Sequence, residues 1–145
     1  MVSPYMDSQE RELRQHLGRY GVIIARRGDG MVLNMTNNVL FDGARVSDKG
    51  SDLLATLAIL LRRYDHSAIA VSGFTDTAGA PDQNLAISQK RARLVVDVLA
   101  KDGVAQARLS AQGFGENSLR VRTGDSVTEP RNRRIEIRVT PTPVG

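Results

Sequence analysis

The chain has 145 residues, of which 41% are hydrophobic and 25% are charged, and its formal net charge is +4. This length and composition are typical of a single soluble domain with a substantial core. The absence of cysteine excludes disulfides, thiol catalysis and thiolate metal ligands. Tryptophan is absent and aromatic residues make up only 4%, which argues against stacking surfaces for nucleic acid or sugar. No apolar run approaches the length of a membrane span, and no signal peptide is recognisable.

The first 20 residues are interpreted as a helical lead-in to the domain. The pattern over residues 7–17 predicts a helix with Asp7 or Ser8 as its N-cap, and Gly18 ends it. The sequence leaves open whether this helix packs on the domain or leads in from a tether.

Residues 21–35 predict a β-hairpin. Val22, Ile23 and Ile24 are expected to point inwards, and residues 27–30 supply the glycines and the aspartate that a tight turn needs. The strand that follows this turn is rich in methionine, valine and leucine, which is typical of a buried strand.

Residues 39–43 form a short apolar segment that enters a loop, and Ser47 then has the character of a helix N-cap. The helix that follows carries apolar side chains at helical spacing. We expect them to be core residues: Leu53, Leu57, Leu60, Leu61 and Tyr64. The two histidines, His16 and His66, lie far apart without carboxylates at ligand spacing, so we expect neither a metal site nor a cofactor.

The second half of the chain predicts a strand, a helix and two further strands. Their expected ranges are 67–72, 84–101, 108–114 and 132–139, with a loop over residues 115–131. In the last strand, Ile135, Ile137 and Val139 alternate with Arg134, Glu136 and Arg138, which predicts one wet face. The element order indicates an α+β fold, in which helices pack on one face of a mixed β-sheet.

The helix over residues 84–101 has an unusual core-facing stripe. On a helical wheel, Asn84, Ser88 and Arg91 fall in line with the apolar Val95 and Val98. The stripe is therefore polar in its N-terminal half and hydrophobic in its C-terminal half. A charge on the core side must be paired or must face a cleft.

Arg91 reaches back towards the preceding loop, which carries Asp76, because helical side chains lean towards the N-terminus. One interpretation is an internal salt bridge between Asp76 and Arg91 that fixes the loop. The other is a pocket that offers one carboxylate and one guanidinium to a ligand with the opposite pair, such as the head group of an amino acid. The residues alone leave both interpretations open.

Five ordered segments between about residues 21 and 139 resemble the OmpA-like C-terminal domain, the peptidoglycan-binding module of bacterial envelopes. The segments are Val39-Leu-Phe-Asp42, Gly73-Phe-Thr-Asp-Thr-Ala-Gly79, Asn84-Leu-Ala-Ile-Ser-Gln-Lys-Arg-Ala92, Leu109-Ser-Ala-Gln-Gly-Phe-Gly-Glu116 and Asn132-Arg-Arg-Ile-Glu-Ile137. The resemblance implies that family's fold, a β/α/β/α/β-β sandwich. It also implies non-covalent binding of the wall through the diaminopimelate of the stem peptide.

The resemblance implies a ligand role for specific side chains. Asp76 would hold the ammonium of diaminopimelate and Arg91 its carboxylate. The remaining candidate binding residues are Thr75, Thr77, Gly79 and Asn84 around the loop, and Asn132 and Arg133 at the start of the last strand.

Two positions depart from the family pattern. Phe74 stands where the family usually has histidine, and Glu129-Pro130-Arg131 leads straight into Asn132 without the usual spacer. The Phe74 position is outside the charge pair, so we expect binding to survive. The missing spacer indicates a different rim of the groove.

Two other functions are compatible with parts of the sequence. A cell-wall hydrolase would use Asp76 with Asp82 as the second carboxylate, but Asp82 is explained by its place at a helix start. A nucleic-acid-binding domain would use the arginines near the C-terminus, namely Arg120, Arg122, Arg131, Arg133, Arg134 and Arg138. Acidic residues interrupt that charge, and we expect neither an enzyme nor a nucleic-acid partner.

The predicted organisation is a lead-in over residues 1–20, a peptidoglycan-binding domain over 21–140 and a tail over 141–145. The resemblance implies a periplasmic protein associated with the outer membrane through a tether outside these residues. The sequence leaves open whether the chain forms a homodimer.

Overall fold

The computed structural model describes residues 4–143, within which the strands form a five-stranded mixed sheet in the order β1-β2-β7-β5-β6. The parallel neighbours β5 and β6 are joined through α4, and the other neighbours are antiparallel. The strands of this sheet are β1 (Ile23–Arg27), β2 (Gly30–Thr36), β5 (Ser67–Phe74), β6 (Leu109–Gly115) and β7 (Arg134–Pro141). A small ribbon pairs β3 (Phe41–Asp42) with β4 (Arg45–Val46).

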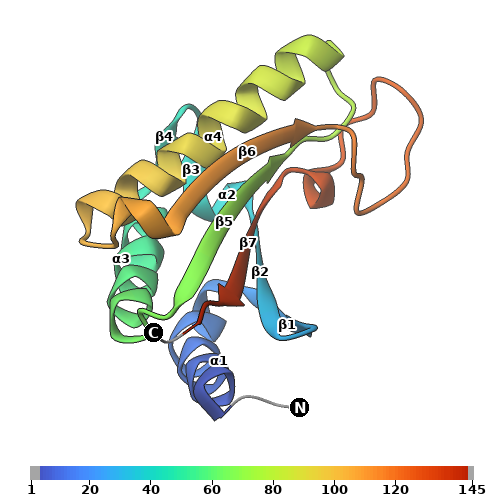
Figure 1. Cartoon of the computed structure of the whole chain (residues 1–145). Helices are drawn as coiled ribbons and strands as arrows, with labels where there is room; N and C mark the ends of the chain where they lie inside the picture. Colours follow the sequence, from blue (N-terminus) through green and yellow to red (C-terminus); the bar gives the residue numbers. More distant parts are fainter. Residues whose placement is uncertain (1–3, 144–145) are drawn as a thin grey trace.

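The two long helices α3 (Asp48–Arg63) and α4 (Pro81–Lys101) lie on the same side of the sheet, as Figure 1 shows. The inward side chains of the central strands, such as Val71 and Ile137, are buried against them. The sequence-based prediction of a mixed sheet with helices on one face is therefore confirmed. The remaining helical segments are α1 (Pro4–Leu17), α2 (Asn37–Leu40) and the 3-10 turns Gly18–Tyr20, Gln106–Arg108 and Pro130–Asn132.

Helix α1 packs on the domain, which decides between the two arrangements that the sequence left open. Met6, Leu13 and Leu17 are fully buried in the common core. Arg14 donates a hydrogen bond from Nη2 to the carbonyl of Ile24 in the edge strand β1, at 2.7 Å. The boundary at residue 20 remains a prediction, and residues 1–3 and 144–145 of the expected lead-in and tail lie outside the described residues.

Two sequence-based expectations about strand faces are wrong. Ile23 is 57% exposed, because Ile24 points into the core and neighbouring strand residues face opposite sides. Arg134 is buried instead of wet, because the loop after β6 covers it and its guanidinium lies 4.1 Å from the ring centroid of Phe74.

Helix α4 lies directly on the ends of β5 and β6 because glycines there leave room for its backbone. A Cβ atom on Gly73 would lie 2.3 Å from the carbonyl oxygen of Ser88, and one on Gly113 would lie 2.3 Å from the amide nitrogen of Gln89. The helix begins at Pro81, three residues before the expected start, since proline suits a first helical turn. This packing sets the start of α4 beside the loop that follows β5.

Candidate functional site

The loop after β5 and the long loop between β6 and β7 lie at the same end of the sheet (Figure 1). Asp76, in the first loop, is buried. Its Oδ1 accepts a hydrogen bond from the amide of Ala78 at 3.2 Å, and its Oδ2 accepts one from the amide of Glu129 at 3.0 Å. Arg133 Nε lies 3.4 Å from the same Oδ2. The carboxylate therefore joins its own loop to the segment over residues 129–133.

Arg91, on α4, is half-buried, with its guanidinium carbon 5.6 Å from the ring centroid of Phe41. Within residues 4–143, no hydrogen bond or ion pair engages this guanidinium. Burial lowers the pKa of Arg91, repulsion from Arg133 lowers it further, and attraction to Asp76 partly offsets both effects. The internal salt bridge considered from the sequence thus forms between Asp76 and Arg133, and Arg91 stays available.

The site as a whole is cationic. Two guanidinium groups, from Arg91 and Arg133, act electrostatically on each other, and one carboxylate, from Asp76, faces both. A hollow of about 240 Å³ adjoins Arg91; it is lined by Gly43, Ala44, Ile87, Lys90, Arg91 and Leu94. Such an arrangement favours a ligand that brings a negatively charged group to Arg91.

The two threonines that flank Asp76 in the sequence are buried and hold the loops in place. The hydroxyl of Thr75 donates to the carbonyl of Asp76 at 2.9 Å. The hydroxyl of Thr77 donates to the carbonyl of Gly124 at 2.8 Å and accepts from the amide of Val127 at 2.9 Å. Thr77 therefore fastens the long loop to the Asp76 loop.

Asn84, on the polar stripe of α4, is also buried and closes the Asp76 loop. Its Nδ2 donates to the carbonyl of Ala78 at 2.9 Å and lies 3.3 Å from both the carbonyl of Asp76 and a carboxylate oxygen of Glu116. Gly79 supplies the positive φ of +85° that this tight loop requires. The polar half of the stripe thus contains Asn84, which holds the Asp76 loop, and Arg91, which forms no hydrogen bond or ion pair within residues 4–143.

Asn132 is fully buried and forms two hydrogen bonds with the long loop between β6 and β7. Its Oδ1 accepts from the amide of Val121 at 2.7 Å, and its Nδ2 donates to the carbonyl of the same residue at 2.8 Å. The structure brings Asp76, Arg91 and Arg133 together as a charged group, whereas the other predicted polar site residues support the loops. Whether those supporting residues also contact a ligand stays a prediction.

Sequence reasoning missed the part that Glu129 plays. Its amide binds Asp76, and its carboxylate accepts hydrogen bonds from the backbone and side chain of Arg131, which lower its pKa from 4.5 to about 2. The Glu-Pro-Arg departure from the family pattern pointed to this position but not to its contacts.

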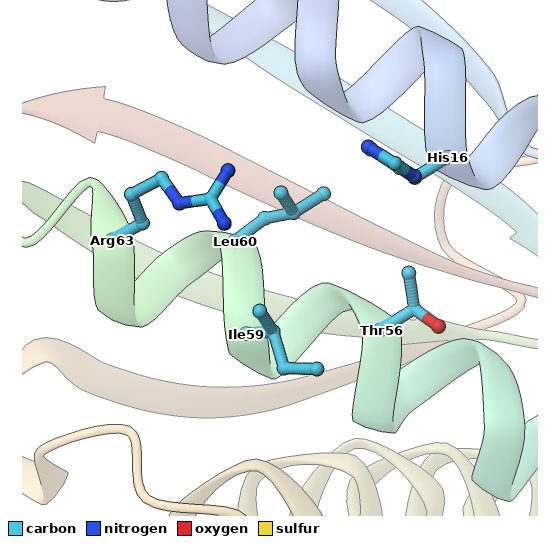
Figure 2. Close-up of a pocket in the computed structure, with 5 residues that line it drawn as sticks. All are labelled: His16, Thr56, Ile59, Leu60 and Arg63. Carbon is cyan, nitrogen blue, oxygen red and sulfur yellow. The ribbon is translucent and has the colours of Figure 1, made fainter.

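A second hollow, of about 170 Å³, lies between α1 and α3 and is lined by His16, Thr56, Ile59, Leu60 and Arg63. Figure 2 shows His16 on α1 facing the α3 side chains. None of the described residues that line this hollow carries a carboxylate, and Arg63 is already paired with Glu12. It therefore differs from the first site, where Asp76 lies beside the two arginines Arg91 and Arg133. Among the described residues, no group of histidines and carboxylates could hold a metal ion.

The family model described as the OmpA family matches residues 40–133, which include every element of the charged site. The chain belongs to the OmpA family. The "Probable lipoprotein YiaD" of Escherichia coli (strain K12) is 37% identical over 142 residues, which cover 97% of this chain and 65% of that protein. The chain thus spans about two thirds of that relative and far less of the porins that it also matches.

Solved structures of other proteins share this fold. The cell wall anchor of the T6SS from Pseudomonas aeruginosa has a TM-score of 0.76 and 28% identity, and the match covers 92% of this chain and 96% of that chain. The peptidoglycan-associated lipoprotein from Burkholderia pseudomallei has a TM-score of 0.63 and 31% identity, covering 70% and 88%. Together with relatives named outer membrane protein, they place this OmpA-family chain in the bacterial cell envelope. No helix within residues 4–143 is long and apolar enough to cross a membrane.

Proposed function

We propose that this OmpA-family domain binds peptidoglycan without cleaving it and anchors an envelope protein to the wall. The ligand group is the free end of diaminopimelate in the stem peptide, which carries a carboxylate and an ammonium. The observation that carries this proposal is the half-buried guanidinium of Arg91, which has no hydrogen-bond or ion-pair partner within residues 4–143 although it lies near a carboxylate.

The carboxylate of the ligand is assigned to Arg91, with Arg133 at its other side. A guanidinium offers two parallel N–H groups that match a carboxylate, and such charge-assisted pairs are roughly twice as strong as neutral hydrogen bonds. The pKa of Arg91 is lowered by burial and then by repulsion from Arg133, and the negative charge of the ligand would offset both effects. Binding therefore uses an electrostatic imbalance already present in the domain.

The ammonium of the ligand is assigned to Asp76. This carboxylate accepts two backbone N–H bonds and faces Arg133. An ionised carboxylate has roughly four acceptor positions, so it retains capacity for one more donor. Thr75, Thr77, Gly79, Asn84 and Asn132 would complete the site by holding both loops in their bound form.

Catalysis is not part of this proposal. A hydrolase needs two carboxylates that face the scissile bond. Asp76 is already engaged by backbone amides, and Asp82 lies in the first turn of α4, where a carboxylate suits the helix dipole. Incubation of the domain with purified wall, followed by chromatography for released fragments, tests this point, and any release that requires Asp76 would contradict it.

The proposal is tested by sedimentation with purified sacculi that contain diaminopimelate. We expect Arg91→Gln and Asp76→Asn to lose most of the binding and Arg93→Gln, which changes an exposed arginine on the same helix, to keep it. Urea unfolding of each variant identifies any loss that is due to misfolding. If both site variants bind sacculi as well as the wild-type domain does, the assignment is overturned.

The wider role of the protein follows from the site and the relatives. We propose that a segment outside these 145 residues links the domain to the outer membrane, since a similar protein is named a probable lipoprotein. Peptidoglycan is then the partner in the periplasm. A homodimer is compatible with this arrangement and is tested by sedimentation equilibrium of the whole protein.

A further inference from the structure

The face of the sheet opposite α3 and α4 carries a group of arginines that the wall-binding site does not use. Arg27 ends β1, Arg138 lies in β7, and Arg120 comes from the long loop. They line a hollow of about 200 Å³ together with Ile23, Ala25, Val32, Asn34 and Glu136. We call this surface the open sheet face.

The open sheet face has an excess of positive charge. All three arginines are exposed, and within residues 4–143 none of them forms an ion pair. Glu136 is the acid among the lining residues, and its carboxylate is engaged by Arg134 Nε at 2.6 Å. The arginines therefore present nearly their full charge to whatever approaches.

The shape of the open sheet face leaves those charges accessible. The cross-strand register places Arg138 beside Val32 on one side and Ala70 on the other, with Ala25 next to Val32. Because these neighbouring side chains are short, they do not cover the guanidinium of Arg138, which is exposed. Ile23, in the neighbouring row, adds an aliphatic side chain that is 57% exposed.

We propose that the open sheet face docks on a membrane surface that contains anionic phospholipid. Lipid phosphates would bind Arg27, Arg120 and Arg138, and Ile23 would enter the headgroup region. Arginine combined with exposed aliphatic surface is the composition that favours a charged lipid interface. A nucleic acid fits this face less well, because none of the described residues that line it is aromatic and could stack on a base.

This inference is independent of peptidoglycan binding, because Asp76 and Arg91 are not among the residues of the open sheet face. One molecule could then contact the wall with the loop end of the sheet and a lipid surface with its uncovered side.

The experiment is co-sedimentation of the full chain with vesicles of equal parts phosphatidylglycerol and phosphatidylcholine, and with vesicles of phosphatidylcholine alone. We expect binding to the anionic vesicles that weakens with added salt. Arg138→Gln and Arg27→Gln should each reduce the partition coefficient about fivefold, which corresponds to about 1 kcal/mol per arginine near the surface. Ile23→Ser should reduce it further. Arg93→Gln and Lys101→Gln, exposed on α4, should leave it within about twofold.

Several results would overturn the inference. They are equal binding to both kinds of vesicle, a partition coefficient that Arg138→Gln and Ile23→Ser leave unchanged, and an equal loss in the α4 control variants. A concentration-dependent dimer that Ile23→Ser dissociates would assign the open sheet face to a second copy of the chain instead. Retention of Arg138→Gln on sacculi at the wild-type level shows that the variant is folded and separates this surface from the wall site.

Discussion

Arg133 Nε lies 3.4 Å from Oδ2 of Asp76, so the carboxylate proposed for the ligand already has a cationic partner inside the protein. Arg91, on α4, forms no ion pair within residues 4–143, but the charges of both Asp76 and Arg133 act on it. The site is therefore a three-membered group, one negative and two positive, rather than a simple pair.

The three-membered group predicts a specific role for Arg133. We expect Arg133→Gln to weaken binding of an isolated stem peptide about tenfold, because one charge-assisted hydrogen bond is worth about 1.5 kcal/mol. The free energy of unfolding should change by less than about 1 kcal/mol, because the side chain of Arg133 is 36% exposed. Isothermal titration calorimetry and urea unfolding measure the two quantities. Arg131→Gln is the control, and unchanged affinity in Arg133→Gln would contradict the role.

The excess positive charge also predicts discrimination between wall types. A stem peptide whose diaminopimelate carboxylate is amidated should bind at least about tenfold more weakly, because a neutral amide cannot satisfy the charge of Arg91. A lysine-type stem, which lacks that carboxylate, should bind as weakly as the amidated one. Competition between the three peptides for the immobilised domain provides the measurement. Equal affinity of the free acid and the amide would remove the carboxylate from the proposal.

The close approach of α4 to β5 predicts a large cost for one methyl group. Gly73→Ala would place a Cβ atom 2.3 Å from the carbonyl oxygen of Ser88, so the helix or the strand must shift. We expect the free energy of unfolding to fall by about 1–3 kcal/mol. Gly124→Ala is the matched control, because nothing lies within 4 Å of its Cβ. Similar denaturation midpoints for the two variants would be inconsistent with this packing.

The buried face of α1 contains a side chain that costs stability. Gln9 is fully buried, and within residues 4–143 neither its amide nitrogen nor its amide oxygen has a hydrogen-bond partner. Gln9→Met, which keeps the approximate size and removes the polar atoms, should raise the free energy of unfolding by about 1–3 kcal/mol. The exposed Gln15 gives the control substitution Gln15→Met, for which we expect little change. Thermal unfolding of both variants measures the change in stability. A destabilised Gln9→Met would show that the amide of Gln9 is hydrogen-bonded in solution.

The pairing of Glu129 with Arg131 predicts a titration at unusually low pH. The folded-state pKa of Glu129 is about 2, below the usual 4.5, so the pairing contributes to stability above pH 4.5. That contribution should disappear as the pH falls from 4.5 towards 2, because the carboxylate is then protonated in the folded state as well. Carbon-detected NMR of the side-chain carboxyl follows the titration directly. Arg131→Gln should move its midpoint upwards, and an unshifted midpoint in that variant would assign the low pKa to another cause.

Much of the fold could be predicted because periodic patterns are local. The alternation in Ile135, Ile137 and Val139 identified the central strand, and Ser47 accepts the capping hydrogen bond that its position indicated. The misplacement of Ile23 has an equally local origin. Three consecutive apolar residues do not define which of them point inwards until the strand pairing sets the alternation.

The candidate site was predictable only in part. The polar stripe on α4 and the loop before it indicated Asp76 and Arg91 as candidate ligand-binding residues from the sequence alone. The partnership between Asp76 and Arg133 was not predictable, because it depends on how the aperiodic loop before Arg133 folds. Hydrogen bonds from the buried side chains of Thr77 and Asn132 determine how this loop folds, and such bonds leave no periodic signal in the sequence.

The hydrogen bond from Arg14 to the carbonyl of Ile24 has a meaning beyond the docking of α1. A terminal strand with free main-chain groups is a template on which a neighbouring molecule can add its own strand. Here the guanidinium of Arg14 occupies one of those acceptors, and Arg26 of β1 is paired with Asp7 and Glu10 of α1. Proteolytic loss of α1 would therefore both uncover apolar residues and leave β1 open to fibril growth at high local concentration.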